Sequence, residues 1–242
     1  MNKMSKLPKA PLVEVVTELR WKITSKEELA GVQYLYGDLY NELKQKYPFR
    51  ESILPVEVPI EMTLNQPVHR FRSEKGGYPL LQVGPGIITL NTIDAKYYWE
   101  TFFEDAKELI QTFFTIYSPN NTMAPALLYI DFFPFDFHEN NVHEFINRKF
   151  NVTFGQSFLE TEKLPTDFNM GFAYNMDLGD LRVNFQKGKN KGTEGILLQT
   201  RLNGNPDQPN IEIINNWLKE AHSLLSNLFK QLTQGELYES FK

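Results

Sequence analysis

Three charged residues near the start of the chain have the spacing of side chains that share one face of a strand. Glu14, Glu18 and Arg20 are four and two positions apart. Because alternate residues of a strand point to the same side, all three would project from one face of a sheet. An arginine beside two carboxylates can orient an anionic or amide-bearing ligand through forked hydrogen bonds. The side chains that we expect to lie opposite them, on other strands, are Arg70, Arg72 and Gln82.

The same residues also allow two other interpretations. On a solvated sheet face, opposite charges form cross-strand ion pairs that contribute little to stability. Paired carboxylates can instead act as acid and base, and a hydrolase would use Glu14 or Glu18 together with His222. No nucleophile motif accompanies these residues, and a hard cation usually needs several oxygen ligands. The sequence therefore favours a protein that is not an enzyme, and it predicts neither a cofactor nor a metal site.

The overall composition bears on the partner and on the cellular location of the protein. The net charge is -5 at pH 7, so a nucleic-acid-binding saddle, which needs clustered cations, is a third and disfavoured hypothesis. The chain contains no cysteine, which excludes disulfides and thiolate chemistry and fits a reducing compartment. No apolar run is long enough to span a bilayer, and the first residues lack the apolar region of a signal peptide. We therefore expect a cytoplasmic protein.

Hydrophobic periodicity predicts a β-α-β(4)-α order for the first half of the chain. Its elements, within residues 1–118, are a strand over 12–21, a helix over 26–46, strands over 54–64, 68–73, 78–83 and 87–91, and a helix over 94–117. Ser25 and Glu28 form a capping box at the start of the first helix. Pro55 and Pro59 make the second strand an edge or irregular strand, because proline cannot donate to a ladder.

The second half, residues 119–242, repeats this order with three or four strands between its helices. Its elements are a strand over 126–137, a short helix over 141–149, strands over 168–176, 181–186 and 195–202, and a closing helix over 211–233. Two such units joined edge to edge would form one curved, largely antiparallel sheet with two long helices on one face. The predicted fold is α+β, with duplicated units in one continuous domain, and resembles the TATA-box-binding-protein-like and helix-grip folds.

Several short motifs resemble a sporadically distributed bacterial protein family of about this length. The most specific is the opening A-P-L-V-E-x-x-x-E-x-R, which runs from Ala10 to Arg20. Others are Phe71-Arg72-Ser73, Tyr98-Trp99-Glu100-Thr101-Phe102 and Tyr129-Ile130-Asp131. The resemblance implies a gene carried in mobile or defence-associated loci, such as those of phage defence, and it transfers no activity or catalytic residue. Within the last motif, Tyr129 and Asp131 complete the predicted ligand-binding residues.

Together these patterns predict a binding or interaction protein. We expect its concave sheet face to hold a peptide, a partner protein or a small ligand, with the candidate residues on the floor of that face. The alternatives are the hydrolase and the nucleic-acid-binding saddle.

Overall fold

The computed structural model describes residues 6–55, 57–117, 119, 121–155 and 163–242. The first part of the chain contains β1 (Leu12–Trp21), α1 (Lys26–Leu43), β2 (Phe49–Ser52), the 3₁₀ helix η1 (Ile60–Thr63), β3 (His69–Arg72), β4 (Leu80–Gly84), β5 (Ile87–Ile93), the 3₁₀ helix η2 (Asp94–Lys96) and α2 (Trp99–Ile116). The second part contains β6 (Met123–Pro134), α3 (Val142–Lys149), β7 (Asn169–Met176), β8 (Gly179–Asn190), β9 (Thr193–Asn203), α4 (Ile211–Leu232) and α5 (Glu236–Glu239).

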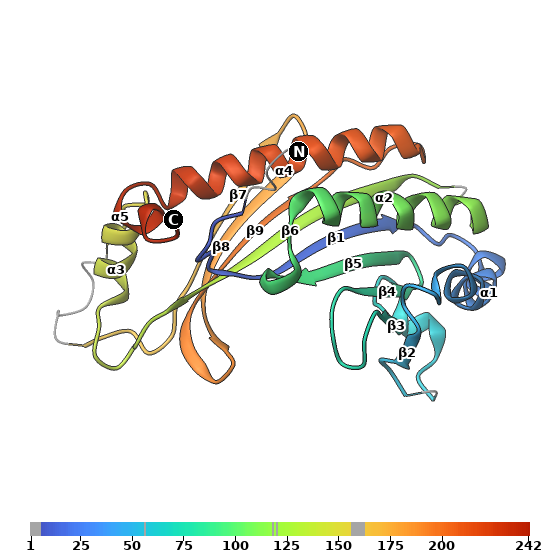
Figure 1. Cartoon of the computed structure of the whole chain (residues 1–242), viewed down its shortest axis with the longest axis horizontal. Helices are drawn as coiled ribbons and strands as arrows, with labels where there is room; N and C mark the ends of the chain where they lie inside the picture. Colours follow the sequence, from blue (N-terminus) through green and yellow to red (C-terminus); the bar gives the residue numbers. More distant parts are fainter. Residues whose placement is uncertain (1–5, 56, 118, 120, 156–162) are drawn as a thin grey trace.

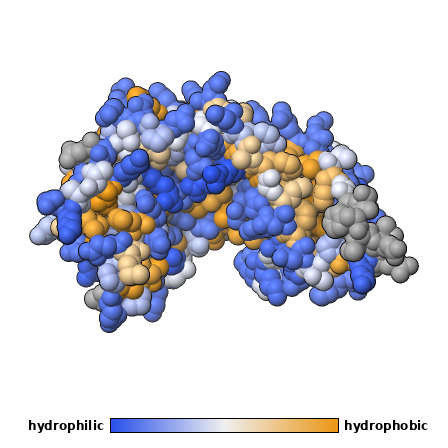
Figure 2. Space-filling view, turned by 180° about the vertical axis from the view of Figure 1, so that it is seen from behind, coloured by the Kyte–Doolittle hydropathy of each residue, from blue (hydrophilic) through white to orange (hydrophobic). Residues whose placement is uncertain are grey.

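The strands form one open, antiparallel sheet, and the fold is α+β. Its nine strands follow the order β2-β3-β4-β5-β1-β6-β9-β8-β7. The long helices α2 and α4 run beside one another along one side of the sheet (Figure 1). On the side away from these helices the molecule is hollowed (Figure 2). A two-layer arrangement of this kind leaves one sheet face uncovered by helices.

Side chains alternate between the two faces along each strand, and β1 shows the division clearly. Val15, Leu19 and Trp21 point toward the helices and belong to the buried core. Glu18 points the other way and joins a polar network. We call these two sides the helix face and the hollow face of the sheet. The strand expected over 12–21 is confirmed with both of its bounds.

The helices bury their apolar stripes against the helix face. Helix α1 begins after Ser25, whose hydroxyl accepts a hydrogen bond from the amide of Glu28 at 3.1 Å, as the capping box predicts. Helix α1 packs against β4, α2 against β5, and α4 against β6 and β9. Residues from both parts of the chain therefore share one hydrophobic core.

The pairing of β1 with β6 joins the two parts of the sheet. The register is continuous from Trp21 to Glu14, and a β-bulge follows before Leu12, which lies opposite Asp131. Each of these central strands also pairs with the last strand of its own part, β1 with β5 and β6 with β9. The sheet thus continues past the boundary expected at residue 118, which itself lies outside the described residues.

The stretch 54–64 and the start of the second long helix differ most from the expectation. The stretch 54–64, of which residue 56 lies outside the described residues, contains η1, and the edge strand is β2 instead. Prolines lack the amide that a ladder requires, so this stretch turns where the periodicity suggested a strand. The second long helix, expected to begin at Asp94, begins later: Asp94 starts η2, and α2 starts at Trp99 after an extended Tyr98.

The two ends of the described chain meet beside the end of α4. The amide of Lys9 donates to the carbonyl of Phe241 at 3.0 Å, and the short helix α5 lies between α4 and that contact. Among the described residues, none of the helices has the length and apolar character needed to cross a membrane.

Substitution of Phe113 measures how much the packing of α2 contributes to the stability of the core. Its ring is fully buried and packs against Trp21 of β1, with 5.0 Å between the ring centroids. Phe113→Ala should lower the free energy of unfolding by about 3 to 5 kcal/mol, because it leaves a large cavity. Phe114→Ala, at a partly buried position, should lower it by about 1 to 2 kcal/mol. Urea unfolding measures both values, and equal losses would contradict the packing described.

Candidate functional site

A row of mostly polar side chains crosses the hollow face of the sheet. Outward from Glu18 in one direction, the paired positions are Thr89, Gln82 and Arg70. In the other direction they are Ala126, Asn203 and Asp180. The structure therefore brings Glu18, Gln82 and Arg70 to one face, and they lie on separate strands along a single row.

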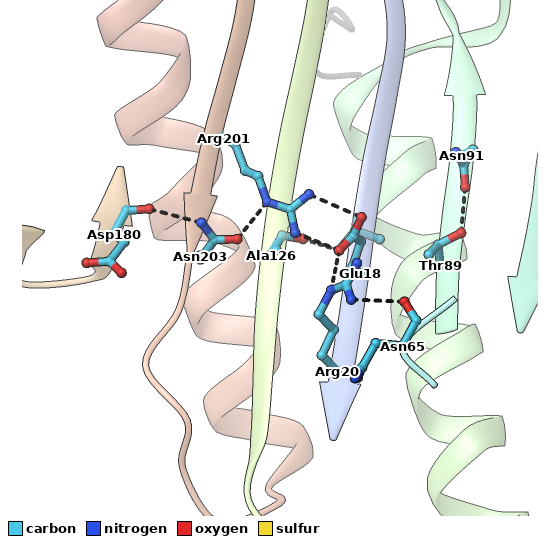
Figure 3. A network of polar contacts seen from close by, with 10 residues as sticks. Glu18, Arg20, Asn65, Thr89, Asn91, Ala126, Asp180, Arg201 and Asn203 are labelled. Carbon is cyan, nitrogen blue, oxygen red and sulfur yellow. Dashed lines mark hydrogen bonds and ion pairs between the residues drawn. The ribbon is translucent and has the colours of Figure 1, made fainter. Parts of the chain in front are cut away.

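Glu18 lies at the centre of this row and is held by two arginines (Figure 3). Arg201 reaches over from β9 and donates to both carboxylate oxygens of Glu18, at 3.2 and 2.6 Å. The Nε of Arg20 donates to the same carboxylate at 2.8 Å, and its Nη1 donates to the carbonyl of Asn65 at 3.2 Å. The Nε of Arg201 donates to the side-chain oxygen of Asn203 at 2.6 Å. These contacts fix both guanidinium groups over a carboxylate that is only 8% exposed.

The charges of this cluster do not cancel. Burial by itself disfavours the ionised form of Glu18, but the hydrogen bonds and charges of Arg201 and Arg20 outweigh that penalty and lower the pKa of this carboxyl. Glu18 is therefore ionised at neutral pH. Two arginines share its single negative charge, so the cluster carries a net positive charge.

A second arginine–glutamate–arginine cluster lies at the β2–β3 end of the sheet. Glu51 accepts from the Nε of Arg72 at 2.9 Å and from the Nη1 of Arg70 at 3.2 Å. Hydrogen bonding by Arg72, followed by Arg70, lowers the pKa of Glu51 although burial opposes it. Unlike Glu18, the Glu51 side chain is 47% exposed. The predicted residues Arg70 and Arg72 thus share a counter-ion that the sequence reasoning did not identify.

Glu14 lies on the hollow face with a neutral partner. Its carboxylate accepts from the side-chain amide of Asn91 at 2.9 Å, and the oxygen of that amide accepts from the Thr89 hydroxyl at 2.7 Å. Glu14 and Glu18 are thus both engaged by residues of the chain itself.

Tyr129 and Asp131, expected on the concave face, lie on the helix face instead. Along β6, Leu128 is paired with Arg201 and therefore points into the hollow, so the neighbouring Tyr129 must point to the other side. Tyr129 there contacts His222 of α4, and both line a pocket together with Asp131. The structure therefore does not bring these two residues together with Glu18.

A chain of neutral hydrogen-bonding groups runs along one wall of this pocket. The hydroxyl of Tyr129 lies 2.8 Å from the hydroxyl of Tyr97 and 2.8 Å from the Nδ1 of His222. Trp99 stacks on the His222 ring, with 3.8 Å between centroids and 8° between planes. Burial, followed by the positive charge of Lys230, lowers the pKa of His222 to about 4, so its imidazole is neutral at pH 7.

Asp131 is the one acidic group in the pocket that is almost fully buried. It is 4% exposed and lies at the β-bulge opposite Leu12, and within the described chain nothing donates a hydrogen bond to its carboxylate. Burial, with a smaller effect from the negative charge of Asp94, raises the pKa of Asp131 to about 7. A buried carboxyl whose pKa lies near neutrality marks a candidate binding site.

His222 does not converge with Glu14 or Glu18. The two carboxylates lie on the hollow face, whereas His222 reaches the helix face from α4, so the sheet separates them. The acid–base pair that the hydrolase hypothesis requires is therefore not assembled. In the ranges that the structure describes, no group of three or more histidine, aspartate or glutamate side chains is placed to hold a metal ion.

No family model, curated protein or solved structure matches this chain. The resemblance to a bacterial family consequently stays a prediction.

The clusters around Glu18 and Glu51 allow the stability contribution of a buried ion pair to be compared with that of an exposed one. Glu18→Gln should lower the free energy of unfolding by about 2 to 4 kcal/mol, because it leaves the Arg201 guanidinium partly buried without a counter-charge. Glu51→Gln removes the same kind of pair from an exposed site and should cost less than about 1 kcal/mol. Urea unfolding at pH 7 compares them, and a larger loss for Glu51→Gln would refute the importance of burial.

Asp131→Asn should make the protein more stable, by an amount that depends on pH. The folded chain holds the Asp131 proton up to about pH 7, whereas the unfolded chain releases it near pH 3.8. Asp131 therefore lowers the free energy of unfolding of the wild type progressively as the pH rises from about 3.8 to about 7. The advantage of Asp131→Asn in free energy of unfolding should grow across this window, to about 2 to 4 kcal/mol, and level off above it.

Unfolding of wild type and Asp131→Asn at pH 5, 6, 7 and 8 measures this difference. His222, whose pKa is lowered, changes stability in the opposite direction, but it does so in both proteins and cancels in the comparison. A difference that is constant with pH would show that Asp131 is ionised throughout.

Proposed function

We propose that this protein is a binding protein that holds an acidic, extended segment of a partner protein in the hollow of its sheet. The observation that carries the proposal is the pair of arginine–glutamate–arginine clusters on the hollow face. Each cluster presents two guanidinium groups around one carboxylate, which leaves positive charge facing the hollow. Guanidinium groups held in fixed orientations are suited to forked hydrogen bonds with carboxylates.

The distribution of arginine supports this proposal. The chain has seven arginines, and five of them belong to the hollow face: Arg20, Arg70, Arg72, Arg182 and Arg201. The protein as a whole carries a net charge of -5. Glu14, Glu18, Glu51 and Asp180 lie on the same face, so its five arginines leave one net positive charge there on an otherwise acidic molecule. That excess favours capture of a negatively charged segment by this face.

Arg182 provides the most direct contact for such a segment. It is exposed on β8 and is paired in register with Arg201, so two guanidinium groups lie on adjacent strands. Like charges placed opposite one another on a sheet repel. In the described part of the chain no carboxylate lies within ion-pair distance of Arg182. A carboxylate supplied by the partner would relieve this repulsion.

We also infer that the chain arose by duplication of a β-α-β(4)-α unit. The support is the shared order of elements and the central position of the first strand in each part. This would give the saddle-like architecture of the TATA-box-binding-protein-like and helix-grip folds. The opening motif from Ala10 to Arg20 supports membership in the bacterial family that it resembles.

The decisive measurement is binding of a fluorescein-labelled peptide of eight glutamates, followed by anisotropy. Arg182→Ala should weaken this binding about ten-fold, which corresponds to the loss of one charge-assisted contact of about 1.4 kcal/mol. Arg50→Ala is the matched control, because Arg50 is an exposed arginine that stacks on Tyr40 away from the hollow. Its binding should equal that of the wild type.

Two further probes separate the partner classes. A peptide of eight glutamines should not bind, and equal affinity for both peptides would refute recognition through charge. A single-stranded oligonucleotide with eight phosphates should bind less tightly than the acidic peptide. Tighter binding of the oligonucleotide would support the nucleic-acid-binding saddle in place of this proposal.

A further inference from the structure

A second cavity, separate from the hollow, lies on the helix face beneath α4. Its volume is about 370 Å³, within the range of small-molecule sites. The segment before β1, the η2–α2 junction, strands β6 and β9, and helices α4 and α5 all contribute to its walls. Both parts of the chain are therefore needed to build it.

Asp131 lines this cavity, and its carboxylate receives no hydrogen bond from the described chain. The residue is only 4% exposed. A buried carboxylate without donors is costly, and native proteins normally satisfy such groups. The β-bulge at Leu12 interrupts the ladder beside it, as bulges often do next to functional sites. A ligand that donates hydrogen bonds would supply what the chain does not.

The remaining walls are suited to an organic cation. Tyr97, Trp99, Tyr129 and Phe229 place aromatic groups around the cavity, and aromatic faces attract ammonium groups. Among the other lining residues, Lys6 is paired with Asp94 at 2.9 Å, while Lys230 and Glu100 carry one charge each. These four charges cancel, so an ionised Asp131 leaves the site with one uncompensated negative charge.

We propose that this cavity binds a compact amine whose ammonium group donates to Asp131 and whose apolar body packs against the aromatic walls. The hydroxyl of Thr200, which also lines the cavity, is available to a second ammonium hydrogen. An anionic ligand would face the carboxylate and be repelled. A neutral ligand would leave the charge of Asp131 unmatched. This site is independent of the hollow face and of the proposal made for it.

Three probes of one size and shape test the charge requirement. Phenethylamine, 2-phenylethanol and phenylacetate share a phenyl ring and a short chain, and they differ in carrying a positive, a neutral or a negative end. Isothermal titration calorimetry with the whole chain at pH 8 should show the amine binding at least ten-fold more tightly than the alcohol. Phenylacetate should not bind.

Three variants assign the binding to this cavity. Asp131→Asn should remove the preference for the amine over the alcohol, whereas Glu14→Gln, a carboxylate on the hollow face, should leave it unchanged. Ser226→Trp introduces a bulky ring into the cavity from α4 and should abolish amine binding while Asp131 stays intact. Thermal melting confirms that each variant is folded.

The proposal is overturned by any of three results. These are failure of phenethylamine to bind at millimolar concentration, equal binding of amine and alcohol, and a preference that survives Asp131→Asn. Loss of amine binding in Arg182→Ala would also count against it, because that residue lies on the opposite face. Failure of the acidic peptide to bind would leave the amine result unaffected, so the two proposals can fail separately.

Discussion

The antiparallel pairing of β1 with β6 is the constraint on which both candidate sites depend. It fixes the register that puts Glu18 within reach of Arg201, a residue 183 positions away in the chain. The same register, interrupted by one bulge, brings Leu12 opposite Asp131 and shapes the cavity beneath α4. A shift of this pairing by one residue would exchange the two faces, because the side-chain period of a strand is two. The network in the hollow and the cavity would then be lost together.

The two faces treat their buried carboxylates in opposite ways. Glu18 is surrounded by guanidinium groups and stays ionised, so its burial is compatible with a stable fold. Asp131 has no such neighbours and keeps its proton up to about neutral pH. The first arrangement holds side chains in place and orients charge outward. The second leaves an acceptor unsatisfied at the edge of a cavity. The difference lies in the donors that the register supplies, since both residues lie on central strands.

Much of the fold could be predicted from the sequence, because apolar and polar residues alternate clearly in β1 and the helices carry periodic stripes. The face occupied by Asp131 could not, because the even positions of the segment Ala126–Phe133 are all apolar whereas Tyr129 and Asp131 lie at odd positions. This pattern suggests that the odd side faces solvent, and in the structure it faces the helices. The contribution of Arg201 was missed, although Gln199, Arg201 and Asn203 alternate with Leu198, Thr200 and Leu202. That alternation predicts that Gln199, Arg201 and Asn203 share one face of a strand. Only the strand order shows that this strand, β9, is separated from β1 by β6 alone, so that Arg201 can reach Glu18.

The cavity beneath α4 is walled partly by the two ends of the described chain. Lys6 and Tyr238 line it, and the contact between Lys9 and Phe241 ties those ends together. This wall lies outside the paired strands and is joined by the hydrogen bond from the Lys9 amide to the Phe241 carbonyl, so we expect it to open more readily than the sheet. Exchange of molecules with solvent would then follow the brief detachment of the ends, while the central strands stay paired. Hydrogen exchange at the Lys9 amide would report how often that detachment occurs.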